Sequence, residues 1–168
     1  DINSDKGEIV LLMNWPNMSV GKREGALSVS ISGVLNKDEQ FLRAKIEART
    51  LVPDLGLVKV TFPDVTGLKS ISDRGEADWI ITPSTMGYRQ KSPLRTGQGV
   101  GSSVPPAMQF VALTDMQRGL YCAEQDPTSA EKQFLFSTGS DNNTLDLRVD
   151  HPVLNWGAQT LQRTYSSP

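Results

Sequence analysis

Cysteine and histidine are almost missing from this 168-residue chain, which contains one of each, Cys122 and His151. A lone cysteine excludes a disulfide within the chain and is typical of a small buried residue in a strand. A zinc site needs several closely spaced His or Cys ligands, so no metal site is expected. A Ser-His-Asp triad would have to use His151, which stands in a turn-like His-Pro step, and no G-x-S-x-G motif is present.

The chain also has no surplus of basic residues, since 17 Lys and Arg stand against 19 Asp and Glu for a net charge of -2. A nucleic-acid surface must neutralise phosphates with clustered Lys and Arg, so nucleic acid is not an expected partner. No apolar stretch approaches the ~20 residues that span a bilayer, so membrane insertion is not expected either. The start at Asp1 is not a signal peptide, and it suits a mature terminus or the edge of an excised piece.

Motifs for phosphate and calcium are absent as well. The G-Q-G-V-G run at residues 97–101 neither opens a G-x-G-x-x-G helix nor precedes Lys-Ser/Thr. The D-N-N-T run at residues 141–144 lacks the acidic spacing of a calcium loop and favours a hairpin turn. We therefore predict no cofactor.

What the sequence does contain is a period of two. Leu27, Val29 and Ile31 alternate with serines, and residues 42–49 alternate Leu, Ala or Ile with charged side chains. This alternation predicts two strands, each with one buried face, and residues 36–39 predict the hairpin connection between them. Residues 39–49 would also suit a helix, because Ala, Leu, Lys and Glu favour helix, but the flanking alternation favours a strand.

Further strands are predicted at short intervals, at residues 8–15, 57–62, 78–82, 108–114, 119–124, 132–137, 144–149 and 159–165. Turn formers separate them, including Pro63-Asp64, Asp126-Pro127 and His151-Pro152. Together they predict an all-β fold, an antiparallel β-sandwich or supersandwich of about ten short strands with little helix, forming a single domain over residues 1–168. Residues 84–106, rich in Gly and Pro, predict a long loop that is functional, covered by a neighbour, or mobile.

A few side chains are candidates for sugar contact. Asp78, Asp115, Glu124 and Asp126 lie in or beside predicted strands, where a solvated face or a turn cap is the alternative to ligand contact. The aromatic rings that could stack on a sugar are those of Trp15, Trp79, Trp156, Tyr88 and Tyr121. Trp79 is predicted in the core because Ile80 and Ile81 follow it, whereas Trp15 and Trp156 lie at strand-to-loop edges, which suit sugar contact better.

Two segments carry a resemblance. The first joins F-P-D-V-T-G-L at residues 62–68 to D-W-I-I-T-P at residues 78–83 and Met86-Gly87. The second runs from P-P-A-M-Q-F-V-A-L-T-D at residues 105–115 through G-L-Y-C-A-E-Q-D-P at residues 119–127. Over roughly residues 55–165 the chain resembles the β-supersandwich (galactose mutarotase-like) domain that precedes the (β/α)₈ barrel in uncharacterised glycoside hydrolase-like proteins. These proteins are distant relatives of α-galactosidases and endo-α-N-acetylgalactosaminidases.

The chain departs from that family at two points. Gln125 stands where a histidine often precedes the Asp-Pro step, so any role of that histidine has no counterpart. The chain also ends at Pro168, where relatives lead toward their barrel, so no barrel carboxylates are expected in it. It would be a fragment, a separately encoded subunit or a reduced domain.

The resemblance implies a non-catalytic accessory domain of a glycoside hydrolase, packing against a catalytic barrel or partner chain and contributing to carbohydrate binding. Candidate ligand-binding residues are Tyr88, Gln109 and Asp126, followed by Trp15 and Trp156; no catalytic residue is expected. Asp126 would accept hydrogen bonds from sugar hydroxyls and Gln109 would donate and accept them, whereas structural roles would be a turn cap and a solvent-facing amide. The alternatives are an autonomous carbohydrate-binding or adhesion module and a structural oligomerisation domain. The compartment stays open, with an extracytoplasmic one favoured as the usual place of polysaccharide degradation.

Overall fold

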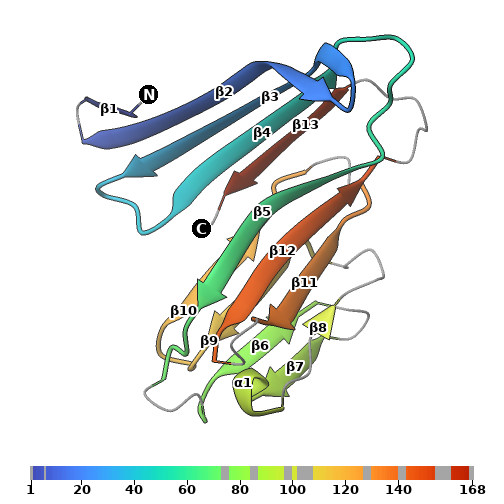
Figure 1. Ribbon diagram of the computed structural model, residues 1–168. Helices are drawn as coiled ribbons and strands as arrows, with labels where there is room; N and C mark the ends of the chain where they lie inside the picture. Colours follow the sequence, from blue (N-terminus) through green and yellow to red (C-terminus); the bar gives the residue numbers. More distant parts are fainter. Residues whose placement is uncertain are drawn as a thin grey trace. The chain divides into compact units, whose positions relative to one another are not determined.

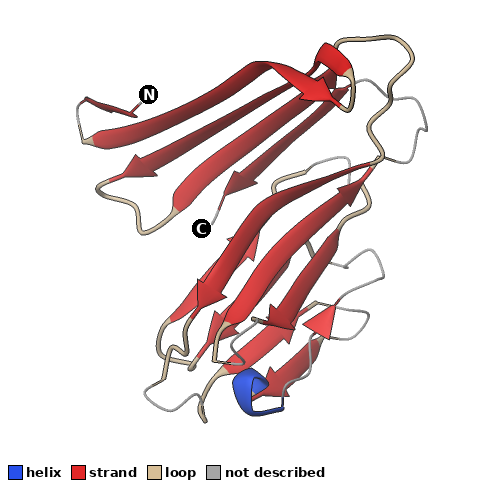
Figure 2. Ribbon diagram, in the orientation of Figure 1, coloured by secondary structure: helices blue, strands red, loops and turns tan. Residues whose placement is uncertain are grey.

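The computed structural model describes residues 2–5, 7–72, 76–83, 87–96, 100–101, 108–126, 130–139, 143–153 and 160–166. These residues contain thirteen strands and one short helix, and the strands pair antiparallel wherever their register is given (Figures 1 and 2). The predicted all-β class with little helix is therefore confirmed. No helix among the described residues is long and apolar enough to cross a membrane.

The chain divides into two compact units, and the prediction of a single domain stays a prediction. The first unit comprises Asp1–Val60, Glu124–Pro127 and Pro152–Pro168. Its five-stranded sheet has the order β1-β2-β3-β4-β13, with β1 at Ile2–Asp5, β2 at Glu8–Val20, β3 at Arg23–Asn36, β4 at Leu42–Thr50 and β13 at Thr160–Ser166. The predicted hairpin between β3 and β4 is confirmed, and a strand rather than a helix follows it.

The sheet of the first unit has an apolar face and a polar face. Trp15 pairs with Val29 and Val29 with Ala48, so that these side chains share one face. Burial on this face falls from β4 to β2, because Ala48 is 3% exposed and Trp15 41%. The apolar face consists of Ile9, Leu11, Met13, Trp15, Val29, Ile31, Leu35, Leu42, Ala44, Ile46 and Ala48. The polar face carries Ser28, Ser30, Ser32, Lys45, Glu47 and Arg49.

The second unit, Thr61–Ala123 and Thr128–His151, contains two four-stranded sheets, which Figure 1 shows as two layers. One sheet has the order β10-β9-β6-β7, with β6 at Trp79–Thr82, β7 at Tyr88–Lys91, β9 at Phe110–Thr114 and β10 at Gly119–Ala123. The other has the order β5-β12-β11-β8, with β5 at Lys59–Leu68, β8 at Val100–Gly101, β11 at Gln133–Thr138 and β12 at Leu145–Pro152. Their buried side chains are Ile80, Val111 and Leu113 from the first sheet and Phe134, Phe136, Leu145, Leu147 and Val149 from the second. The predicted sandwich is thus confirmed.

Two predicted turns are wrong. Pro63-Asp64 lies inside β5, and the Phe62–Pro63 peptide bond is cis. A proline fits there because β5 is an edge strand, where the missing N–H interrupts no ladder on the open side. His151-Pro152 ends β12 rather than forming a turn, and the buried His151 places Nε2 2.9 Å from the carbonyl oxygen of Phe62.

The predicted loop at residues 84–106 is wrong in part, since its described residues form β7, the helix α1 (Pro93–Thr96) and β8. In β7, Gln90 is buried between the exposed Arg89 and Lys91. This alternation is that of a strand with one covered face, and β7 pairs with β6 at the sheet edge.

Candidate functional site

The predicted ligand residues are divided between the two units. Trp15 lies half-exposed on β2, and Asp126, only 8% exposed, also belongs to the first unit. Tyr88, 48% exposed, begins β7 in the second unit, and Gln109 directly precedes β9 there. Trp156 lies outside the described residues. The role of each of these residues in ligand binding stays a prediction.

Gln109 supports a buried cation. Its Oε1 accepts a hydrogen bond from Lys132 Nζ at 2.6 Å, and Lys132 is 1% exposed. Lys132 continues the inward alternation of Phe134 and Phe136 on β11, so its ammonium lies at the end of an apolar face. A buried ammonium must be hydrogen-bonded, because desolvating an unpaired charge costs several kcal/mol. This contact gives Gln109 a structural role that the sequence did not indicate.

The outer face of the β10-β9-β6-β7 sheet gathers aromatic rings. Ile80 is fully buried, so Trp79 and Ile81 point to the opposite side of the sheet and are half-buried. The expectation that Trp79 lies in the core is corrected, because Trp79 and Ile80 are adjacent in β6 and therefore point to opposite faces of the sheet. We call this surface the aromatic face, and define it by Trp79, Ile81, Arg89, Lys91, Phe110, Ala112 and Tyr121.

The register of the four strands arranges this face in rows. Tyr121 pairs with Ala112, Ala112 with Ile81 and Ile81 with Arg89, so one row crosses the whole sheet. Adjacent strands lie ~4.8 Å apart, which separates the Cα atoms of Tyr121 and Arg89 by about 14 Å. Ala112 lies beside Tyr121 in this row. Because its side chain is small, the surface of the sheet is lower next to the phenol ring.

Each end of the row has a ring contact. Arg89 and Lys91 both lie over the Trp79 ring, with Arg89 Cζ at 5.0 Å and Lys91 Nζ at 5.7 Å from its centroid. At the other end, Tyr121 stacks on Phe110 with centroids 5.1 Å apart and an interplanar angle of 21°. Within the described part of the chain, neither Arg89 nor Lys91 forms an ion pair with a carboxylate. Burial raises the pKa of the Tyr121 phenol, so it is neutral at physiological pH.

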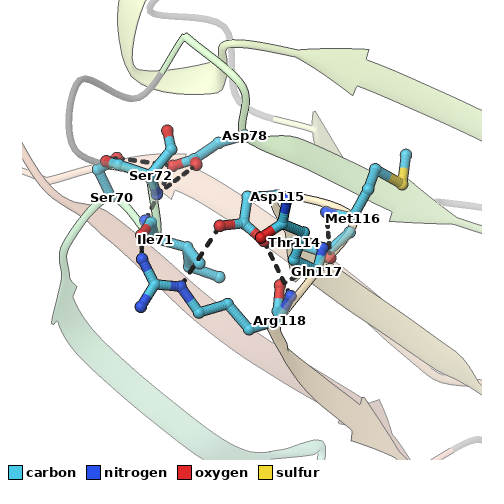
Figure 3. A network of polar contacts seen from close by, with 9 residues as sticks. All are labelled: Ser70, Ile71, Ser72, Asp78, Thr114, Asp115, Met116, Gln117 and Arg118. Atoms are coloured by element: carbon cyan, nitrogen blue, oxygen red, sulfur yellow. Dashed lines mark hydrogen bonds and ion pairs between the residues drawn. The ribbon is translucent and has the colours of Figure 1, made fainter.

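A polar network holds the segment that precedes Trp79. The Asp78 carboxylate accepts hydrogen bonds from Ser70 Oγ at 2.9 Å, Ile71 N at 3.1 Å and Ser72 N at 2.8 Å (Figure 3). Burial would raise the pKa of Asp78, but hydrogen bonding of the charged form by Ser72, Ser70 and Ile71 lowers it below its ordinary value. Asp78 is therefore an ionised clamp that fixes the start of β6 and with it the position of Trp79.

The β9–β10 hairpin is fixed by the same network. Asp115 Oδ1 accepts hydrogen bonds from Gln117 N and Arg118 N, both at 2.9 Å. The bonds from Arg118 N and then Gln117 N lower the pKa of Asp115. Arg118 Nη2 donates to Ile71 O at 3.0 Å and so ties the hairpin to the segment held by Asp78 (Figure 3). The carboxylates of Asp78 and Asp115 thus accept hydrogen bonds from nearby backbone N–H groups, which is the structural role of a turn cap.

The aromatic face combines rings and cations, and none of its defining residues carries a carboxylate. No group of three or more His, Cys, Asp or Glu side chains that could hold a metal ion occurs among the described residues. Sequence reasoning missed Arg89 and Lys91, whose only signal was their alternation around Gln90 within a Gly- and Pro-rich stretch.

Comparison with known proteins finds distant similarity to solved structures. No family model matches the chain, and no curated protein matches it. Among solved structures, it is similar to a galactose mutarotase related enzyme from Lactobacillus acidophilus, with a TM-score of 0.47 and 9% identity over 99% of this chain and 69% of that one. A similarity this distant transfers neither a residue role nor an activity to the chain.

Proposed function

We propose that the chain is a non-catalytic β-sandwich module of a carbohydrate-active protein, and that it binds carbohydrate through the aromatic face. The observation that carries the proposal is the outward placement of Trp79, Phe110 and Tyr121 on one sheet, where solvent-facing positions are usually polar. Aromatic rings stack on the apolar C–H faces of sugars, and a rigid sheet holds them at low entropic cost. The resemblance of residues 55–165 to a glycoside hydrolase accessory domain points to the same ligand class.

The test of this proposal is a glycan array probed with the full chain, together with assays of aryl glycoside hydrolysis. We expect binding that Tyr121→Ala weakens, and no turnover. Hydrolysis that Asp126→Ala abolishes would contradict the non-catalytic assignment. An array without any binding above background would contradict the assignment of carbohydrate as ligand.

The apolar face of the first unit supports a second function, association with a catalytic barrel or partner chain. Ile9 is 39%, Leu35 40%, Trp15 41% and Leu42 51% exposed, and they share one sheet face. Exposed apolar patches of this kind mark interaction surfaces. If a second copy covers this face, the chain self-associates, and Ile9→Ser weakens that association.

Sedimentation velocity over a range of concentrations measures this directly. Leu12→Ser is the matched control, because Leu12 is 43% exposed on the opposite face of the same strand. A chain that stays monomeric at all concentrations would exclude a structural oligomer and leave a barrel or another chain as the partner.

A further inference from the structure

The two cations of the aromatic face specify its ligand more closely. We infer that the aromatic face binds an anionic oligosaccharide, with its carboxylate or sulfate groups at Arg89 and Lys91 and a sugar ring at Tyr121. This inference rests on the proposed function and adds the chemical class of the ligand. It is carried by the juxtaposition of two cations and two ring contacts on one sheet surface.

Arg89 and Lys91 are prepared to bind an anion. Within the described residues they have no ion-pair partner, whereas Arg43 and Lys45, with the same spacing on β4, pair with Glu39 and Glu47. The side chains of Arg89 and Lys91 are both exposed, so an anion in solution can reach them. Guanidinium and ammonium groups bind carboxylate and sulfate through charge-assisted hydrogen bonds.

Trp79 is a positioning residue in this arrangement. Its ring holds both cations by cation–π contacts, which restrict the long side chains before a ligand arrives. Less rotamer entropy is then lost on binding, and this loss is one of the main costs of immobilising Arg and Lys. The cations in turn cover the ring, so the sugar is expected to stack elsewhere.

Tyr121 provides that second contact. Phe110 supports one side of its ring, and the small Ala112 beside it leaves room for a sugar ring to lie against the phenol. The row from Tyr121 to Arg89 spans about 14 Å. That length exceeds one sugar ring, so the two ends of the row would contact different rings of one oligosaccharide.

The experiment is titration calorimetry of the full chain with an oligogalacturonate and a heparin oligosaccharide, which carry carboxylate and mainly sulfate groups respectively. A neutral galacto-oligosaccharide of equal length and a polyglutamate peptide serve as controls. We expect one or both anionic sugars to bind more tightly than either control. The double variant Arg89→Gln/Lys91→Gln lowers that affinity about tenfold or more, because each loses a charge-assisted contact.

The matched control variant is Arg43→Gln/Lys45→Gln, which removes the same charges at the same spacing from β4 in the other unit. It leaves the affinity unchanged, while Tyr121→Ala weakens binding without changing its salt dependence. Equal losses with both double variants, or equal affinity for polyglutamate, would reveal non-specific attraction and overturn the inference.

Two further outcomes show whether the inference fails alone or together with the proposed function. Binding of the neutral sugar as tightly as the anionic ones, lost with Tyr121→Ala but retained by Arg89→Gln/Lys91→Gln, would overturn the anionic ligand and leave the sugar-binding function intact. Absence of binding to every saccharide would contradict both.

Discussion

The guanidinium carbon of Arg89 lies 5.0 Å from the centroid of the Trp79 ring, across the boundary between strands β7 and β6. Such a contact is worth ~0.5–1 kcal/mol at an exposed site, so its value here lies in holding the cation in place more than in stabilising the fold. Lys91, paired directly with Trp79 in the ladder, lies over the same ring. The side chains of β6 that point outward therefore decide which chemical groups this surface of the sheet presents.

Because neighbouring residues of β6 face opposite sides of the sheet, substitutions at two neighbouring positions should have unequal effects on stability. Ile80 is fully buried, so Ile80→Ala should lower the free energy of unfolding by about 2–5 kcal/mol through lost burial and a cavity. Ile81→Ala removes the same atoms from the half-buried outer face and should cost less than half as much. Urea denaturation followed by circular dichroism measures both. A larger loss for Ile81→Ala would mean that the two faces of β6 are assigned the wrong way round.

The Asp78 clamp predicts a dependence of stability on acid pH. Its pKa is lowered in the folded chain, so the ionised carboxylate stabilises the fold fully above its ordinary value of 3.8. That contribution is lost as the pH falls below 3.8 and through the lowered folded pKa. Asp78→Asn should cost about 1–3 kcal/mol near pH 7, because an amide cannot accept all three hydrogen bonds.

The measurement for Asp78 is the unfolding free energy of wild type and variant between neutral and acid pH. The difference between them should shrink as the solution becomes more acidic. Asp64→Asn, at an exposed position of β5, removes the same charge and is the control. A wild-type–variant difference that stays constant down to the lowest pH would contradict the role of the ionised carboxylate.

The hydrogen bond between Gln109 and Lys132 predicts coupled effects on stability. Gln109→Leu removes an acceptor of the buried ammonium and should lower the free energy of unfolding by about 1–3 kcal/mol. Lys132→Met removes the charge, so Gln109→Leu should cost less in that background, with a coupling energy of about 0.5–3 kcal/mol. Thermal or urea unfolding of the wild type, the two single variants and the double variant completes the cycle. Gln117→Leu, in the exposed hairpin turn, is the control, and additive losses would rule out the buried pair.

Tyr121 predicts a dependence of stability on alkaline pH. Burial raises its pKa above the ordinary 10.0, so its contribution to stability is fully present below pH 10.0 and is lost as the pH rises through the folded pKa. The difference in absorbance near 295 nm between wild type and Tyr121→Phe isolates the titration of this phenol. Its midpoint should lie above 10.0. A midpoint at or below that value would mean that the ring is more solvated than the fold implies.

Much of the fold could be predicted because alternation is a local property. Each predicted strand overlaps a described one, including residues 27–32 in β3 and 42–49 in β4. The strand β7 was missed because four residues at a sheet edge, between Gly and Pro, carry too short a pattern. The sequence predicts a turn at the proline of β5, because the edge position of this strand depends on strand order, which is non-local.

The aromatic face could not be predicted for a related reason. In the run Trp79-Ile80-Ile81 every residue is apolar, so the sequence gives no clue to which side of β6 faces the core. Only the pairing with β9, whose Val111 and Leu113 are buried, decides it. Likewise, the hydrogen bond between Gln109 and Lys132 could not be predicted, because no local pattern links two positions 23 residues apart.

The most direct test of the binding surface is to map it by amide chemical shifts of the ¹⁵N-labelled full chain during titration with an oligogalacturonate. Binding at the aromatic face predicts that the perturbed amides cluster on β6, β7, β9 and β10, with those of Arg89, Lys91 and Tyr121 among the largest shifts. Perturbations confined to the β2–β3 hairpin of the first unit, or shifts spread evenly over exposed lysines and arginines, would contradict it.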